Sequence, residues 1–402
     1  GLITTLLEMC FSNMEGGMEI SLNKIKEDDI IKILFAENPG IVIQVKDKHK
    51  EEVKKILEDA GIGYVKLGKP TEERHILVEK GDATYQFGID YLRDVWYSTS
   101  YLLDRKQSMN GCAKKRFENY KKQPLEFVFD KSFTGKLSQF DLNPDRRTPT
   151  GIKAAIIREK GTNGEREMAY MLYLAGFDVK DVTMTDLVSG RETLEDINFI
   201  VFCGGFSNSD VLGSAKGWAG AFLFNPKAKA ALDNFYARKD TLSLGVCNGC
   251  QLMIELNLIN PDFTKKAKML HNDSHKFESK FVGVTVPMNR SVMFGSLSGS
   301  KLGIWVAHGE GKFSLPYHED KYNVVLKYSY DEYPGNPNGS DYSVAGLASP
   351  DGRHLAMMPH LERSCFPWQN AYYPADRIKN DQITPWMEAF VNARKWIEMN
   401  KK

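Results

Sequence analysis

Cys247 lies at the centre of a Gly-x-Cys-x-Gly motif that follows the short apolar segment 242–246 and precedes a helical pattern starting at Gln251. Strand, sharp turn and helix in this order are typical of a nucleophile elbow, here with a thiol in place of a serine hydroxyl. The glycines relieve crowding at the reversal. The N-terminus of the following helix favours a thiolate and offers N–H groups to an oxyanion. We therefore expect Cys247 to be a displayed, covalent nucleophile.

A thiol nucleophile needs a base, and the best candidate is the His-x-Glu sequence of His360 and Glu362, which ends the apolar segment 354–358. Residues two apart on an extended segment share a side, so Glu362 can fix the tautomer of His360 and stabilise the imidazolium. Cys247, His360 and Glu362 are therefore predicted to form a triad. Most of the other histidines are expected to be surface or packing residues.

Two glycine-containing turns at the ends of other apolar segments can complete such a site. The pair Gly204 and Gly205 follows the strand candidate 199–202 and can leave backbone N–H groups free for an oxyanion, although a turn that needs positive φ would explain it equally well. The turn 308–311 carries His308 and Glu310, either of which could bind a polar substrate. Taken alone, this second turn would be only a turn.

Cys247 and Cys250 also have the spacing of a zinc knuckle or a redox motif, but no second pair follows at a usable interval. We expect no metal site, and we expect Cys250 to be buried in the first turn of the helix. The sequence contains neither of the glycine-rich phosphate-binding motifs of nucleotide-binding folds.

The elements around the triad alternate from residue 152 onward. Near-continuously apolar strand candidates are separated by amphipathic helix candidates, with strands at 152–157, 177–182, 199–202 and 242–246, and helices at 165–175, 226–237 and 251–258. This alternation predicts an α/β fold with a doubly wound, mostly parallel sheet that is covered on both faces. Ligands bind beyond the C-terminal ends of such strands, which is where Cys247 falls.

A chain of 402 residues is too long for one ordinary core. Residues 1–85 mix helix and strand patterns and predict a small α+β module, with a strand at 41–45 and a helix at 50–60 that packs on a sheet. Residues 86–150 are predicted to be one more helix followed by a polar, proline-containing linker. The remaining segment, 151–402, is predicted to be the catalytic domain.

The overall charge is nearly balanced, with 53 basic and 52 acidic side chains, so nucleic acid and anionic lipid are unlikely partners. The longest apolar runs fall far short of the roughly 20 residues that span a bilayer. Six scattered cysteines predict no disulfide framework and favour the cytoplasm. The first residue, Gly1, is followed by no signal-peptide pattern, which indicates a start inside a larger protein.

Together these motifs resemble the class I (triad) glutamine amidotransferases, whose sheet is flavodoxin-like. The resemblance is carried by the segments 157–168, 204–207, 210–213, 245–251, 308–311 and 336–340. In combination they are similar to the large single-chain members that serve purine biosynthesis. Residues 1–85 resemble the C-terminal part of an aminoimidazole-ribonucleotide-synthetase-like domain.

The resemblance implies hydrolysis of glutamine through a thioester on Cys247, with His360 as the base and Glu362 orienting it. It also implies a set of residues that bind glutamine and its oxyanion: Gly205, Phe206, Asn248, Gln251 and His308. One departure is Leu361, where family members usually have proline. Losing that ring leaves the alternation of the neighbouring side chains intact, so we expect activity to survive.

The resemblance further implies that ammonia passes to a synthetase site, which uses ATP and Mg²⁺ to convert formylglycinamide ribonucleotide to formylglycinamidine ribonucleotide. That site lies mostly in an N-terminal synthetase portion of the same polypeptide, so this chain by itself is expected to bind glutamine and no cofactor. The alternatives are another Cys-His-Glu hydrolase on the same fold and a catalytically silent scaffold. Gln251, the turn 308–311 and the N-terminal module favour the amidotransferase.

Overall fold

The computed structural model describes residues 1–401 and divides into two compact units, unit 1 (Gly1–Lys106) and unit 2, which begins at Gln107. Each unit has its own hydrophobic core. Within the described residues, no helix combines the length and the apolar character that crossing a membrane requires.

Unit 1 is an α+β module built on a four-stranded sheet with the order β2-β1-β3-β4. Its elements are α1 (Leu2–Phe11), β1 (Gly17–Ser21), α2 (Ile30–Phe35), α3 (Lys50–Asp59), β2 (Gly68–Thr71), β3 (His75–Lys80), β4 (Ala83–Gly88) and α4 (Ile89–Asp104). Alternate residues of β1 and β3, among them Ile20, Ile76 and Val78, point into the core, where α1 contributes Ile3 and Leu6.

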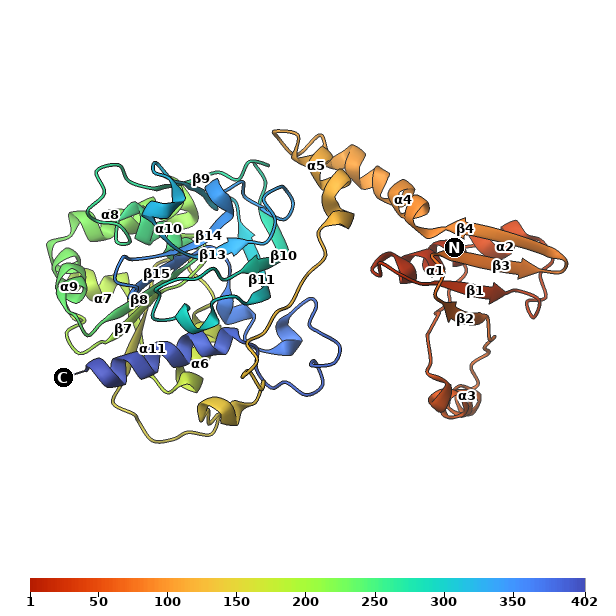
Figure 1. The fold of residues 1–402 in the computed structure, drawn as a ribbon, viewed down its shortest axis with the longest axis horizontal. Coiled ribbons are helices and arrows are strands. Elements are labelled where there is room, and N and C mark those ends of the chain that lie inside the picture. Colours follow the sequence, from red (N-terminus) through yellow and green to blue (C-terminus); the bar gives the residue numbers. More distant parts are fainter. Residues whose placement is uncertain (402) are drawn as a thin grey trace. The chain divides into compact units, whose positions relative to one another are not determined.

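Two predictions for unit 1 are wrong. Residues 41–45 form no strand, and Ile41 is 90% exposed, because an apolar segment becomes a strand only where a neighbouring strand supplies hydrogen bonds. Helix α3 exists but buries none of its residues. Figure 1 shows α3 held between two long extended segments, away from the sheet on which it was predicted to pack.

Unit 2 is built on a nine-stranded sheet with the order β11-β10-β13-β14-β15-β8-β7-β5-β6. The strands are β5 (Lys153–Arg158), β6 (Asp178–Thr183), β7 (Phe199–Phe202), β8 (Leu242–Val246), β10 (Glu278–Thr285), β11 (Lys301–His308), β13 (Asn323–Tyr328), β14 (Val344–Ala348) and β15 (His354–Met357). From β15 to β6 all neighbours are parallel, whereas β11, β10, β13, β14 and β15 pair antiparallel. The predicted α/β fold is confirmed, and an antiparallel half extends it.

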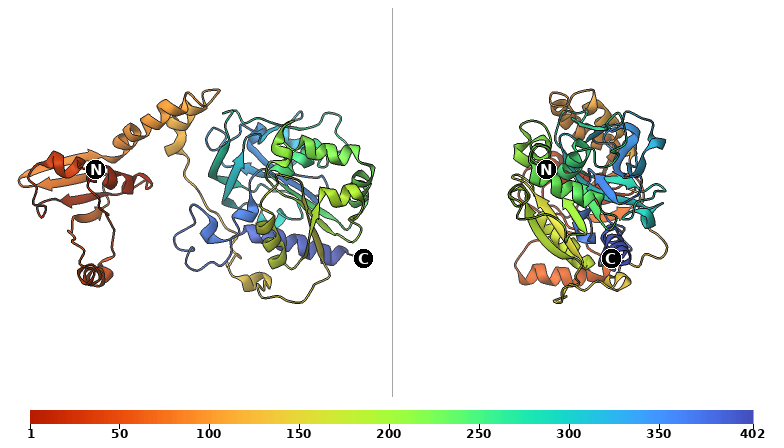
Figure 2. Two further views of the ribbon diagram at one scale, coloured as in Figure 1. Left: turned by 180° about the vertical axis from the view of Figure 1, so that it is seen from behind. Right: turned by 90° about the vertical axis from the view of Figure 1, so that its left-hand side faces the viewer.

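Helices cover both faces of the parallel half, as Figures 1 and 2 show. On one face lie α6 (Glu165–Ala175) and α11 (Trp386–Asn400), and on the other lie α7 (Met184–Ser189), α8 (Lys216–Phe224), α9 (Pro226–Ala237) and α10 (Asn248–Glu255). Right-handed crossovers require this change of face, because the chain moves outward from β5 to β6 and then returns across β5 to β7. The loops after β5 and β7 therefore meet at the switch point, where Thr162 pairs with Gly205.

The two compact units divide the chain differently from the predicted 1–85, 86–150 and 151–402. Helix α4 completes unit 1, and the expected linker from residue 107 onward belongs to unit 2. It includes α5 (Cys112–Asn119), and its residues Phe133, Phe140 and Leu142 are buried in the large core. These buried residues were not predicted from the sequence, because they occur singly in a polar segment and follow neither a helical nor a strand period.

These anchors predict that unit 2 needs residues 107–150 for stability. A chain shortened to begin at Gln107 should unfold cooperatively near the temperature at which unit 2 unfolds in the full chain. A chain that begins at Gly151 loses Phe133, Phe140 and Leu142, each worth about 2 kcal/mol of burial, and its midpoint should fall by about 10 °C or more. Calorimetry of the two chains measures this difference, and equal midpoints would contradict it.

Candidate active site

Cys247 occupies a strained turn between β8 and α10, with φ of 53° and ψ of −108°. The two glycines of its motif are required by close contacts. A Cβ on Gly249 would lie 2.0 Å from the carbonyl oxygen of Phe202, and a Cβ on Gly245 would lie 2.5 Å from the carbonyl oxygen of Gly249. The motif therefore lets α10 start directly against the ends of β7 and β8.

The expectation that Cys247 is displayed is wrong, because its exposed fraction is 5%. Its thiol lies 3.4 Å from the carbonyl oxygen of Ala307, at the end of β11. Cys250, in the first turn of α10, is completely buried, as its position in the motif indicated. A covered nucleophile is shielded from bulk water.

The structure brings Cys247, His360 and Glu362 together. Nδ1 of His360 lies 2.6 Å from Oε1 of Glu362, and both side chains are buried. The imidazole and the Cys247 side chain both face Gly204, where a Cβ would lie 2.8 Å from Cε1 of His360 and 3.3 Å from Cβ of Cys247. Gly204 is thus needed for space beside the pair.

The reason given for the His360–Glu362 contact is corrected. His360 is extended, but Glu362 lies in a single 3-10 turn, Leu361–Arg363, and so the contact does not come from strand alternation. The side chain of Leu361 is buried, and the departure from proline leaves the 2.6 Å contact in place.

Charge in this buried site stabilises the imidazolium. Burial alone lowers the pKa of His360, but the carboxylate of Glu362 and the hydrogen bond and charge of Cys247 outweigh it and raise the pKa to about 10. At neutral pH His360 therefore carries a proton that Glu362 holds on the ring. The protonated ring of His360 thus lies beside Cys247 as a charged partner and proton donor.

The oxyanion donors predicted from the sequence are only partly available. The N–H of Phe206 donates to the carbonyl oxygen of Gly161 at 2.8 Å, so Phe206 is corrected as a donor. The N–H of Gly205, where φ is 120°, makes no hydrogen bond within residues 1–401. The N–H of Asn248 is also available, since the first residue of a helix has no preceding turn to accept it.

Asn248 and Gln251 use their side chains to tie three loops together. Oδ1 of Asn248 accepts the N–H of Ser207 at 3.1 Å, and its Nδ2 donates to Oε1 of Gln251 at 2.9 Å. Nε2 of Gln251 in turn donates to the carbonyl oxygen of Glu310 at 2.7 Å. Each amide end of Gln251 keeps one further bonding position, which a substrate can use.

His308 is buried and neutral. Burial, followed by the positive charge of His360, lowers the pKa of His308 to about 3. Its Nδ1 lies 3.2 Å from Oδ1 of Asn272, and that amide is oriented because its Nδ2 donates to the carbonyl oxygens of His308 and Lys276. Nδ1 therefore carries the proton, and Nε2 is a buried acceptor with no partner in the described part of the chain.

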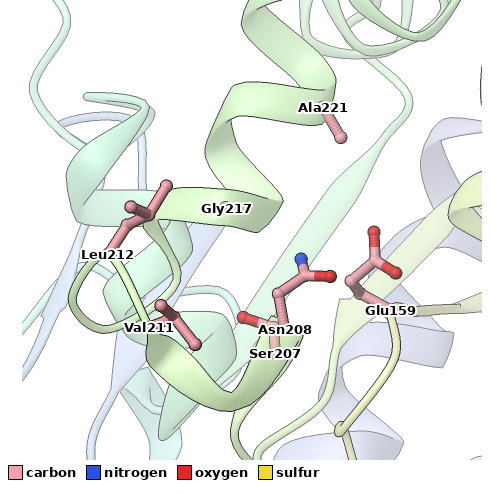
Figure 3. Close-up of a pocket in the computed structure, with 7 residues that line it drawn as sticks. All are labelled: Glu159, Ser207, Asn208, Val211, Leu212, Gly217 and Ala221. Carbon is pink, nitrogen blue, oxygen red and sulfur yellow. The ribbon is translucent and has the colours of Figure 1, made fainter.

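A surface cavity of about 460 Å³ lies on the loop after β7, as Figure 3 shows. It contains none of the triad. Seven residues line it: Glu159, Ser207, Asn208, Val211, Leu212, Gly217 and Ala221. The cavity is a depression of the surface beside the loop that carries Gly205.

Within residues 1–401, no group of three His, Cys, Asp or Glu side chains could hold a metal ion.

Sequence reasoning missed two residues of this site, Asn272 and Asn338. Nδ2 of Asn338 donates to the carbonyl oxygen of Gly311 at 2.7 Å, and Asn272 holds the other side of the same turn. Asn338 lies in the segment 336–340, which had been singled out for resemblance alone. Asn272 has no motif around it, and only the folded structure connects it with His308.

Comparison with known families agrees with both units. Residues 151–397 match the family described as CobB/CobQ-like glutamine amidotransferase domain. This chain belongs to that amidotransferase family. Residues 1–80 match the family described as AIR synthase related protein, C-terminal domain.

Among curated relatives, phosphoribosylformylglycinamidine synthase of Homo sapiens is 38% identical over 431 residues, which cover 98% of this chain and 31% of that protein. The probable chloroplastic/mitochondrial phosphoribosylformylglycinamidine synthase of Arabidopsis thaliana is 37% identical and covers 99% of this chain. This chain thus spans less than a third of their length. The predicted resemblance to this synthase, as well as to the amidotransferases, is confirmed.

A solved structure of PurLQS from Thermotoga maritima is 27% identical to this amidotransferase chain. It covers 62% of this chain and 99% of its own, with a TM-score of 0.47.

The charge of Glu362 predicts the reactivity of Cys247. In Glu362→Gln the imidazolium loses its counter-charge, the pKa of His360 falls, and the thiolate loses its partner. Alkylation of Cys247 by iodoacetamide at pH 7 should slow by about tenfold. Peptide mass spectrometry measures the rate. Glu167→Gln, an acid near Arg363 that does not contact His360, is the control.

Linkage gives a matching prediction for stability. Since the pKa of His360 is raised in the folded chain, its pairing stabilises the fold fully below about pH 6.5, and this contribution is lost as the pH rises towards 10. Urea unfolding of the wild type should therefore show a loss of stability between pH 7 and 10 that is smaller in Glu362→Gln. Identical losses in both proteins would contradict the charge pairing.

The elbow predicts a steric effect. In Gly249→Ala the new Cβ would meet the Phe202 carbonyl at 2.0 Å, so α10 must shift or the fold must lose about 2–3 kcal/mol. Gly295→Ala, where nothing lies within 4 Å of the new Cβ, should change stability by less than about 0.5 kcal/mol. Urea unfolding of both variants tests the contrast.

Proposed function

We propose that unit 2 hydrolyses glutamine through a thioester on Cys247 and supplies ammonia to a phosphoribosylformylglycinamidine synthase reaction. The observation that carries the proposal is the buried contact of His360 with Glu362 beside Cys247 and the unpaired N–H of Gly205. A nucleophile, a proton carrier with its orienting group, and an oxyanion donor are the parts that acyl transfer requires.

In the first step the Cys247 thiolate attacks the side-chain amide carbon of glutamine. The negative charge that forms on the amide oxygen is stabilised by the N–H groups of Gly205 and Asn248. The imidazolium of His360 gives its proton to the departing nitrogen, the C–N bond breaks, and ammonia leaves. The acyl group stays on Cys247 as a thioester.

In the second step His360, now neutral, takes a proton from water, and the resulting hydroxide attacks the thioester carbon. The C–S bond breaks, glutamate leaves, and the thiolate and imidazolium are restored. Glu362 keeps the same contact with Nδ1 in both steps. Its role is to orient the ring and to stabilise its charged form.

In this proposal His308 and Gln251 bind the polar groups of glutamine by hydrogen bonds. The unprotonated Nε2 of His308 accepts a hydrogen bond, so it suits an N–H group of glutamine and would repel its carboxylate. The remaining positions on the Gln251 amide can bind either polar end. The side chain of Phe206 is 46% exposed and contacts the tilted ring of Phe277, so it shapes the rim of the site.

Ammonia would be used outside unit 2. The relatives' name and the match of residues 1–80 support transfer to a synthetase portion that uses ATP and Mg²⁺ on formylglycinamide ribonucleotide. A cytoplasmic location is part of this proposal; the six free cysteines of the fold fit a reducing compartment.

Capture by a diazo-ketone analogue of glutamine tests the site. Cys247 should be labelled stoichiometrically, with loss of N₂, glutamine should protect it, and Cys247→Ser should abolish labelling. A peptidase-like hydrolase or a silent scaffold would show labelling that ignores glutamine or none at all. Intact-protein mass spectrometry gives the result.

Activity separates the two halves of the proposal. Cys247→Ser in the full-length synthase should abolish glutamine-dependent synthesis and leave ammonia-dependent synthesis intact. Loss of both activities would overturn the role of Cys247. Glutamate release by this chain, with and without the synthetase portion, shows whether the glutaminase works alone.

A further inference from the structure

Asn272 is completely buried, and its hydrogen bonds converge on the turn 308–311. Its backbone N–H donates to the carbonyl oxygen of Gly309 at 2.9 Å, and its Nδ2 donates to that of His308 at 2.7 Å. Its Oδ1 accepts the N–H of Gly311 at 3.0 Å and faces Nδ1 of His308 at 3.2 Å. One side chain thus satisfies both ends of the turn.

The turn 308–311 also holds helix α10, which begins directly after Cys247. The carbonyl oxygen of Glu310 accepts the amide of Gln251 at 2.7 Å, Gln251 accepts the amide of Asn248, and Asn248 accepts the N–H of Ser207. This relay therefore runs from Asn272 to the loop that carries Gly205. All of its side-chain members are buried, which makes the bonds costly to break.

Close packing leaves the turn little freedom. A Cβ on Gly311 would lie 2.5 Å from Nδ1 of His308, so the imidazole rests directly on the Gly311 backbone. On the other side Asn338 donates to the carbonyl oxygen of Gly311. The turn is therefore fixed from two sides, and of these two asparagines Asn272 is the one that also faces Nδ1 of His308.

We propose that Asn272 is a positioning residue for glutamine hydrolysis, which fixes the tautomer of His308 and, through Glu310, Gln251 and Asn248, the oxyanion loop. The proposal rests on the glutaminase function proposed above. Asn272 touches no reacting atom in it. Its effect is to hold the acceptor Nε2 of His308 and the donor N–H of Gly205 in place before substrate arrives.

The variant Asn272→Asp keeps the size of the side chain, but it replaces Nδ2 with an oxygen that faces two carbonyl oxygens. Capture of Cys247 by the diazo-ketone analogue should slow by about tenfold or more, because a displaced oxyanion donor cannot polarise the ketone. Alkylation by iodoacetamide, which needs no oxyanion donor, should stay within about twofold of wild type.

Asn323→Asp is the matched control. Asn323 is buried, and its side chain donates to the carbonyl oxygen of Ser349 and accepts the N–H of Arg290, without a hydrogen bond to the turn 308–311 or to the segment 336–340 that supports it. It introduces the same charge into the same unit, and its analogue capture should remain near wild type. Equal losses in both variants would show that Asn272 is merely structural and would overturn the proposal. Asn272→Ser repeats the test without a buried charge.

A spectroscopic measurement keeps the proposal separate from the proposed function. In ¹⁵N-histidine spectra assigned with His308→Gln, wild-type His308 should be the neutral Nδ1–H tautomer from pH 5 to 8. In Asn272→Asp, the carboxylate beside Nδ1 should make His308 titrate in that range, whereas in Asn323→Asp it should not. If wild-type His308 is the Nε2–H tautomer, the role of Asn272 is overturned. If His308 is the Nδ1–H tautomer but Cys247 shows no glutamine-protected capture, only the glutaminase function is overturned.

Discussion

The close approach of α10 to the ends of β7 and β8 is the constraint on which the site depends. Gly249 and Gly245 permit it, because a methyl group at either position would overlap backbone atoms. This approach forces Cys247 into its positive-φ turn and places the free N–H of Asn248 beside the sulfur. The nucleophile and one oxyanion donor are thus products of a single packing contact.

Burial gives the electrostatics of the site their strength. Two histidines lie in the same covered region with opposite protonation states. His360 is held positive by Glu362, whereas His308 has no counter-charge and stays neutral beside it. One ring can therefore donate a proton and the other can only accept a hydrogen bond at its free nitrogen, a separation of roles that follows from their neighbours and not from residue type.

The antiparallel half of the sheet contributes more than support. Its strand β11 ends at the turn 308–311, to which Asn272 is hydrogen-bonded. The residues that follow Asn272 are bonded in turn to the start of unit 2, because Met109 and Asn110 donate to the carbonyl oxygens of Ser274 and Asp273. The segment expected to be a linker is therefore bonded next to the residue that fixes the turn. Hydrogen bonds of this kind hold the groups that bind substrate in fixed positions, so these groups need to move little during the reaction.

The sequence alone determined the α/β fold and the elbow at Cys247, because these depend on local periodicity and on a short motif. It also indicated the pairing of His360 with Glu362, which lie close in the chain, but the 3-10 turn that makes this contact came only from the structure. Tertiary structure decided what depends on distant neighbours: the exposed segment 41–45, the packing of residues 107–150, the occupied N–H of Phe206 and the place of Asn272. Hydrogen bonds and buried contacts between residues far apart leave no period in the sequence, so only the folded chain reveals which donors are free and which are satisfied.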